Sequence, residues 1–189
     1  MKYRLLLIMS VYFISCERTH NVNLKDVALS DMSGSMVNVA KLADNGTAVF
    51  IFISPECPLC INYTKTIKEL RIKFLSDSIV FIPVYPGSLI SMKEINEFSD
   101  EYDFKLSGLM DPDLRLTELL HATVTPEAVV VTKSGDIVYS GAIDNWMYET
   151  GKKRTVITKN FLEDALSALL KGEKPEPGKT EAVGCFIEL

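Results

Sequence analysis

Two short apolar runs, separated by a segment with helical periodicity, constrain the fold more than any other feature of this chain. Residues 48–53 (AVFIFI) and 79–84 (IVFIPV) contain no polar side chain, which is typical of strands that are buried on both faces. Between them, apolar side chains recur at steps of three and four, as on one face of a helix. They are Leu59, Tyr63, Ile67, Leu70 and Phe74. Strand, helix and strand in this order predict a unit in which the two strands are parallel.

The remaining pattern predicts further elements around this unit. The first is a small hairpin within residues 23–42, around the turn 31–34. Two helices follow, one capped by Ser91 and Glu94 and a short one opened by Asp111 and Pro112 that runs to Leu120. A hairpin of strands 128–132 and 137–142 and a last helix from about residue 160 to residue 170 complete the order. Parallel units followed by an antiparallel hairpin and a closing helix predict an α/β fold. Its centre is a mixed β-sheet flanked by helices, with an N-terminal β-hairpin extension.

The first residues have the layout of an export signal. Lys2 and Arg4 are followed by an apolar stretch, residues 5–14, which as a helix would span about 15 Å, half of a bilayer core. We therefore interpret residues 1–15 as a secretory signal peptide. Cys16, directly after Ser15, resembles the cysteine of a bacterial lipobox, although Phe13 replaces the usual Leu. We expect Cys16 to be lipidated, the alternative being a signal with an incidental cysteine.

The expected organisation is one exported domain held at a membrane only by its N-terminal lipid. Residues 16–22 would be the lipidated cysteine and its tether, residues 23–172 the domain, and residues 173–189 an extended tail containing Pro175 and Pro177. The net charge of −5 becomes −7 once Lys2 and Arg4 are removed. Such a charge argues against a nucleic-acid partner. We expect the protein in the cell envelope or periplasm, an oxidising compartment.

Two cysteines stand where the first buried strand gives way to the helix. Residues 54–56 turn the chain, and Pro58 suits the first helical turn, so the side chains of Cys57 and Cys60 face the same way within disulfide distance. The helix N-terminus favours a negative sulfur on Cys57, lowering the pKa from about 8.5, while the neighbouring Glu56 opposes this. We expect Cys57 to be the reachable, attacking thiol and Cys60, one turn deeper, to resolve the mixed disulfide.

In this context the chain resembles the thioredoxin superfamily, in particular bacterial redoxin and peroxiredoxin-like lipoproteins. The resemblance covers residues 23–189. It rests on Cys57-Pro58-Leu59-Cys60, on Val124-Thr125-Pro126 and on Tyr139-Ser140-Gly141-Ala142-Ile143-Asp144. It implies a thiol–disulfide oxidoreductase without a cofactor, a cis Pro126 lying against the cysteine pair, and Thr125 offering its backbone to an extended substrate peptide. The motif departs from the Trp-Cys-Gly-Pro-Cys of thioredoxin at Glu56, Pro58 and Leu59. The reduction potential, the protein substrate and the redox partner are therefore left open.

The tail carries one further cysteine. Residues 182–187 (AVGCFI) resemble the Gly-Cys-x-Ile tail of a bacterial redoxin subgroup. That resemblance implies, as a hypothesis, that Cys185 reaches the site and pairs with Cys57. An idle thiol is the alternative, because spacing alone does not predict connectivity.

Three other functions are compatible with parts of the sequence. A thiol peroxidase would use Cys57, with Ser54 three residues before it, but Phe50 stands where peroxiredoxins have Pro. A copper-binding lipoprotein would use the thiols and His121, although copper-handling relatives space their cysteines differently. The third is a non-catalytic binding module with a static disulfide. No metal site is expected under the preferred interpretation.

Overall fold

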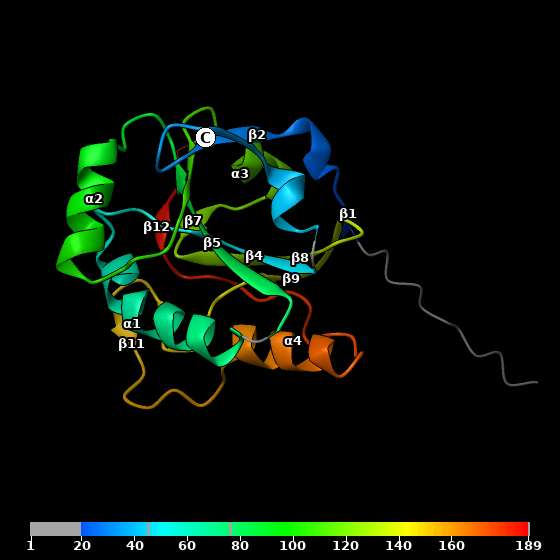
Figure 1. Cartoon of the computed structure of the whole chain (residues 1–189). Helices are drawn as coiled ribbons and strands as arrows, with labels where there is room; N and C mark the ends of the chain where they lie inside the picture. The colour runs from blue at the N-terminus through cyan, green and yellow to red at the C-terminus, as the bar shows by residue number, and fades with distance from the viewer. Residues whose placement is uncertain (1–19, 45, 76, 189) are drawn as a thin grey trace, which may run out of the picture.

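The computed structural model describes residues 20–44, 46–75 and 77–188 (Figure 1). The predicted signal peptide, residues 1–15, and the predicted lipidation site, Cys16, lie outside the described residues. The strands are β1 (His20–Asn21), β2 (Ala28–Asp31), β3 (Met36–Asn38), β4 (Thr47–Phe52), β5 (Ile79–Pro86), β6 (Leu109–Asp111), β7 (Val124–Thr125), β8 (Glu127–Thr132), β9 (Asp136–Gly141), β10 (Met147–Glu149), β11 (Lys152–Lys153) and β12 (Cys185–Phe186). The helices are α1 (Pro58–Lys73), α2 (Met92–Glu101), α3 (Arg115–Leu120) and α4 (Phe161–Leu170), with 3₁₀ helices at Leu24–Asp26 and Val39–Leu42. None of the helices in the described part of the chain has the length and hydropathy to cross a membrane.

Eight strands form one mixed sheet in the order β1-β9-β8-β4-β5-β6-β2-β3. β4, β5 and β6 are parallel to one another. β8 runs antiparallel to β4 on one side and β2 antiparallel to β6 on the other, and the next strands outward, β9 and β3, reverse direction again. The predicted mixed α/β sheet is thereby confirmed. β6 is an addition to the predicted order, because a strand of three residues is too short to show a period. The parallel strands bring their carboxyl ends to one edge of the sheet, where functional groups of open α/β folds gather.

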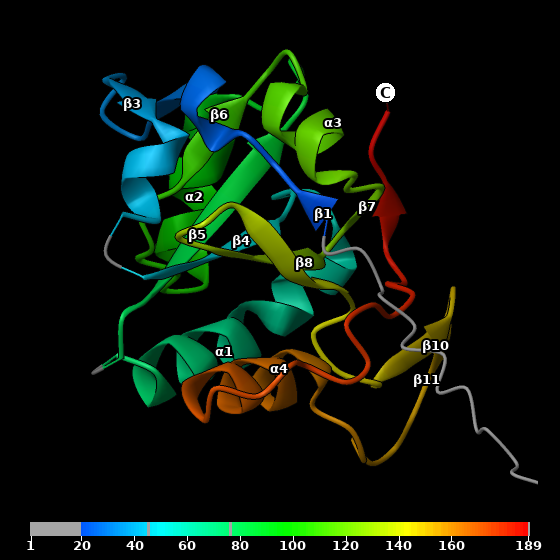
Figure 2. The same ribbon diagram turned by 90° about the vertical axis from the view of Figure 1, so that its right-hand side faces the viewer.

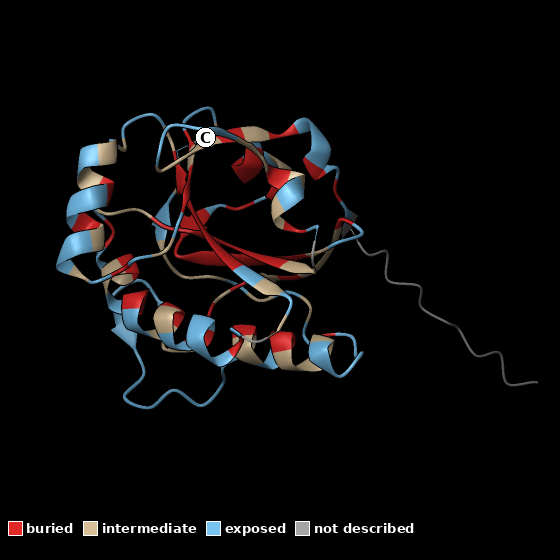
Figure 3. Ribbon diagram, in the orientation of Figure 1, coloured by how far each residue is buried: buried red, intermediate tan, exposed pale blue. Residues whose placement is uncertain are grey.

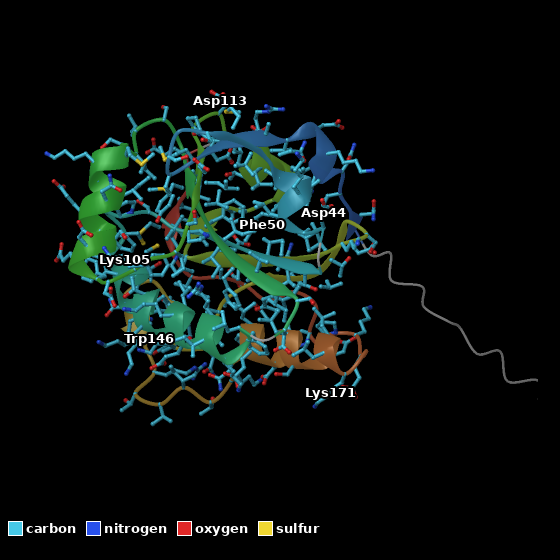
Figure 4. The ribbon with its side chains drawn as sticks, viewed as in Figure 1. Asp44, Phe50, Lys105, Asp113, Trp146 and Lys171 are labelled. Carbon is cyan, nitrogen blue, oxygen red and sulfur yellow. The ribbon has the colours of Figure 1, made fainter. Side chains whose placement is uncertain are left out.

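Helices cover both faces of this sheet. α1, α2 and α4 pack on the face that carries Val49 and Ile51. α4 begins next to the end of α1, where the Lys73 ammonium pairs with the Glu163 carboxylate at 2.6 Å (Figure 1). α3 and the two 3₁₀ helices pack on the face that carries Ala48, Phe50 and Phe52. Because successive side chains of a strand point to opposite faces, the buried part of β4, Ala48 to Phe52, must be apolar on both faces. Figure 3 shows the central strands as buried, and Figure 4 labels Phe50 in the interior.

The predicted helix start at Asp111 and Pro112 is wrong. α3 begins at Arg115, and Leu114 before it has a left-handed backbone with φ 57°. Asp111 instead ends β6, where parallel pairing with β5 keeps it extended. Its buried carboxylate nevertheless caps α3 from a distance, since Oδ2 accepts hydrogen bonds from the Thr117 N–H at 2.8 Å and the Thr117 hydroxyl at 2.7 Å.

The other predicted elements are confirmed. β2 and β3 form the antiparallel hairpin around residues 31–34, and β2 also pairs with β6, so this hairpin extends the main sheet. At α2 the capping box is present: the Ser91 hydroxyl accepts from the Glu94 N–H at 3.3 Å, and the Glu94 carboxylate accepts from the Ser91 N–H at 2.7 Å. α4 starts directly after its N-cap, Asn160.

The chain after α4 is extended and returns across the domain (red in Figure 2). It is first tied to the edge of β9: the Ser140 N–H donates to the Gly178 carbonyl at 3.1 Å, and the Thr180 N–H donates to the Ser140 carbonyl at 2.9 Å. Further on, β12 pairs antiparallel with β7, with Cys185 opposite Thr125. The tail therefore ends against the strand that precedes Pro126.

Candidate active site

Local geometry places Cys57 at the start of α1. After β4 the chain turns, and the Cys57 N–H donates to the Ser54 carbonyl at 3.2 Å. Cys57 is the N-cap residue with an extended backbone, and Pro58 is the first helical residue, where a missing N–H costs nothing. The Cys57 carbonyl already accepts from the Ile61 N–H at 3.1 Å. A buried strand thus holds the thiol at a helix N-terminus, as the sequence predicted.

The sulfur of Cys57 lies among three polar groups. As a thiol it donates to the Thr125 carbonyl at 3.1 Å. The thiols of Cys60 and Cys185 both hydrogen-bond to it. The bond from Cys60 is the largest influence and outweighs burial, and with the bond from Cys185 it lowers the pKa of Cys57 to about 4. These two thiols stabilise the thiolate form of Cys57 and favour it at neutral pH.

Cys60 has the opposite character. It is 1% exposed, and its sulfur accepts a hydrogen bond from the Ser54 N–H at 3.4 Å. Burial, then the hydrogen bond and charge of Cys57, raise the pKa of Cys60 well above its usual value. Burial also raises the pKa of Tyr85, at the carboxyl end of β5. One thiol of the pair is thus held ionised and the other protonated.

Thr125, which precedes Pro126, lies against the sulfur of Cys57. The Thr125–Pro126 peptide bond is cis, as the resemblance implied. β7, which contains Thr125, is held in place by the buried carboxylate of Glu127, which accepts from the Thr123 N–H at 2.8 Å and the Val124 N–H at 3.3 Å. The backbone of Thr125 contacts Cys57 through its carbonyl and is paired with the tail.

The tail brings Cys185 to the site, together with a groove. The groove has a volume of about 610 Å³, and its lining includes Cys57, Thr125, Cys185 and residues 86–90. Cys185 is exposed. Partial burial of its sulfur, then the hydrogen bond and charge of Cys57, raise the pKa of Cys185 to about 12.

The prediction that Cys57 is reachable from solvent is wrong for this arrangement. Cys57 is 2% exposed, because β7 lies on one side of its sulfur and the thiol of the tail strand approaches it as well. Periodicity cannot place a tail that follows the domain, so local patterns did not indicate this cover. Only the resemblance of residues 182–187 implied that Cys185 reaches the site.

Comparison with solved structures identifies the architecture. A hypothetical protein from Sinorhizobium meliloti superimposes with a TM-score of 0.76 at 19% identity, covering 90% of this chain and 94% of that one. An uncharacterized conserved protein from Geobacillus kaustophilus gives 0.76 at 17%, covering 92% and 94%. A secreted disulfide oxidoreductase of Mycobacterium tuberculosis gives 0.54 at 17%, covering 79% and 96%. The fold is thioredoxin-like. No protein-family model and no curated protein matches the sequence.

Within this thioredoxin-like fold, sequence reasoning missed a buried polar cluster behind the cysteine pair. Tyr63, one turn after Cys60, donates to the Asp144 carboxylate at 2.6 Å, and the Trp146 N–H donates to the same oxygen at 2.8 Å. The Trp146 ring also meets the Tyr63 ring edge-on, with centroids 5.6 Å apart. Tyr63 was assigned to the apolar helix face, and only the tertiary fold brings Asp144 to it.

The described residues do not support a metal site. No group of three or more His, Cys, Asp and Glu side chains among them is arranged to hold an ion. His121, the candidate ligand of the copper alternative, is the C-cap residue of α3. The chemistry that this arrangement can perform is exchange between thiols and disulfides.

Proposed function

We propose that this protein is a membrane-tethered thiol–disulfide oxidoreductase that acts on protein thiols or disulfides in the cell envelope. The observation that carries the proposal is the position of Cys57 at the N-terminus of α1, one turn before the buried Cys60. There the pKa of Cys57 is lowered and that of Cys60 is raised.

Cys57 is the attacking sulfur of the proposed cycle. Only a thiolate attacks a disulfide, and its pKa of about 4 keeps Cys57 ionised throughout the physiological range. Attack on a substrate disulfide joins Cys57 to one substrate sulfur and releases the other as a thiolate.

Cys60 is the resolving sulfur. Its raised pKa keeps it protonated until the negative charge on Cys57 has been converted into a disulfide bond, because that charge is one cause of the raised pKa. Once the mixed disulfide forms, Cys60 loses its proton more easily and attacks Cys57, which releases the reduced substrate.

The substrate that fits the groove is an extended segment of a protein. Displacement of β12, which pairs with β7 in this conformation, would open the backbone of Thr125 to a substrate. Two exposed apolar side chains line the groove, Leu89 at 87% and Phe186 at 86% exposure. Backbone pairing gives affinity without sequence preference, and exposed apolar side chains suit unfolded or partly folded polypeptide. We assign Thr125 and Pro126 to substrate binding on this basis.

A stabilised thiolate also indicates the direction. Every interaction that lowers the pKa of Cys57 stabilises the reduced pair relative to the disulfide, which makes the couple more oxidising. The attacking cysteine of thioredoxin has a pKa of about 7 and a couple near about −270 mV. We therefore expect the Cys57–Cys60 couple to lie above that potential.

Peroxidase activity has less support. Phe50, at the position where peroxiredoxins have Pro, is fully buried in β4 and pairs with Ile82 and Val129. A residue fixed in the central strand of the sheet cannot belong to a peroxide-binding loop.

The membrane tether is proposed from the sequence of residues 1–16. Lipid on Cys16 would keep the domain at the membrane surface. Expression in a bacterial host followed by membrane fractionation tests it: wild type should sediment with membranes and Cys16→Ser should not. Equal distribution of the two would contradict lipidation.

Catalysis is tested by reduction of a protein disulfide, with insulin as the probe and a thiol reductant as the electron source. Wild type should accelerate the reaction, Cys57→Ser should abolish the acceleration, and the double variant Cys60→Ser, Cys185→Ser should accumulate a mixed disulfide on Cys57. Equilibration with glutathione buffers gives the potential of the couple. A wild-type protein that leaves insulin unreduced and does not equilibrate would overturn the proposed function.

A further inference from the structure

The position of the tail strand is that of a bound peptide. β12 adds to the free edge of β7 in antiparallel register, and the Ile187 N–H donates to the Thr123 carbonyl at 2.9 Å. Strand addition of this kind is a common way to bind an extended polypeptide. The approach is close, because a Cβ atom on Gly184 would lie 2.3 Å from the Thr125 carbonyl oxygen. Glycine at this position is what allows the strand to pair.

Access to solvent differs sharply among the three thiols. Cys57 and Cys60 are 2% and 1% exposed, whereas Cys185, which hydrogen-bonds to Cys57, is exposed. A partner protein that approaches this conformation therefore meets Cys185 before it meets either cysteine of the helix. The arrangement connects a buried redox pair to the surface through one sulfur.

We propose that Cys185 is the third thiol of the redox site and relays the disulfide from the buried Cys57–Cys60 pair to the thiols of a partner protein. This inference rests on the proposed function and adds to it the point of contact with the partner. The β7–β12 pairing holds Cys185 in place for the exchange.

The relay balances without an outside oxidant. In the oxidised protein, the Cys185 thiol loses its proton and attacks the Cys57 sulfur. The Cys57–Cys60 bond breaks, its electron pair leaves on the Cys60 sulfur, and Cys60 takes up a proton. The Cys57–Cys185 disulfide has then replaced the Cys57–Cys60 disulfide.

The partner then completes the transfer. A partner thiolate attacks the Cys185 sulfur, and Cys57 leaves as a thiolate. A second partner thiol attacks the partner sulfur of the mixed disulfide, which frees Cys185 and leaves the partner oxidised and this protein reduced. Attack at Cys185 is favoured twice, because this sulfur is the exposed one and because the leaving group, Cys57, has the lower pKa.

The first experiment asks whether the intermediate forms. The full chain carrying Cys16→Ser and Cys60→Ser keeps two thiols, Cys57 and Cys185, and is oxidised in a glutathione buffer. Mass spectrometry of an unreduced digest should find an intrachain Cys57–Cys185 disulfide as the main product. Adding Gly184→Val, which keeps both thiols but disrupts the strand pairing, should remove that product. If the protein without Gly184→Val carries glutathione on both cysteines instead of the intrachain disulfide, the relay is refuted.

The second experiment tests whether disulfide transfer to a partner protein proceeds through Cys185. Oxidised protein with Cys16→Ser is mixed with reduced, unfolded ribonuclease A as the protein dithiol, with and without Cys185→Ser. Cys185→Ser should slow the exchange about tenfold or more, while its Cys57–Cys60 couple still equilibrates with glutathione. Circular dichroism checks that this exposed substitution leaves the fold intact.

The alternative, a tail that only covers the site, gives a different result. Cys185→Ser would then exchange at the wild-type rate and Gly184→Val would exchange faster, and this pattern would refute the relay while leaving the proposed function standing. Failure of the wild-type protein to exchange with ribonuclease A or glutathione would instead refute the proposed function itself.

Discussion

The low pKa of Cys57 has two possible physical origins, and one substitution separates them. The helix N-terminus contributes about 0.3–1 kcal/mol at most sites, whereas a hydrogen bond to a charged group contributes about 1.5–3 kcal/mol. The thiol of Cys60 is the largest influence on Cys57. Cys60→Ala removes this donor and keeps α1 and its N-terminus.

The magnitude follows from the free energy of that bond. One pKa unit corresponds to about 1.36 kcal/mol, so loss of a bond of about 1.5–3 kcal/mol should raise the pKa of Cys57 from about 4 to about 5–6. Cys185→Ala should raise it less, since the bond from Cys185 is a smaller influence. At pH 7 the sulfur stays ionised in every variant, and the difference appears only on acidification.

The assay is the ultraviolet absorbance of the thiolate as a function of pH, measured on reduced protein with Cys16→Ser and corrected with a Cys57→Ser control. A transition in Cys60→Ala that stays at the wild-type pH would refute the reasoning. It would assign the low pKa to the helix N-terminus, as the sequence alone suggested.

Three further substitutions test the packing around the site. Tyr63→Phe deprives the buried Asp144 carboxylate of its 2.6 Å donor and should lower the free energy of unfolding by about 1–3 kcal/mol, as measured in urea; an unchanged midpoint would contradict this role. Gly141 has φ 132°, and a Cβ atom there would lie 2.1 Å from the Thr180 carbonyl oxygen. Gly141→Ala should therefore detach the tail from β9 and make it sensitive to limited proteolysis. A wild-type cleavage pattern would count against the contact. Phe50→Ala should cost about 3–5 kcal/mol of stability, because the ring is fully buried in β4; a loss below about 1 kcal/mol would mean that the core refills.

The amino-acid sequence by itself determined the central sheet and the place of the thiol pair. Strand β4 and helix α1 are fixed by local periodicity and by the turn between them, so Cys57 and Cys60 could be placed without coordinates. The same reasoning failed at Asp111, because the extended pairing of β6 with β5 depends on residues distant in the chain.

Only the tertiary structure decided what surrounds the sulfur of Cys57. The tail strand, Cys185 and the carbonyl of Thr125 meet it through contacts that span the chain. The resemblance of the tail implied that Cys185 reaches the site, but periodicity does not encode such pairings. Periodicity records which side of an element is buried, but it does not record what covers it. For this protein the sequence therefore located the reactive thiol, and the fold decided that it is enclosed and that a third thiol stands between it and solvent.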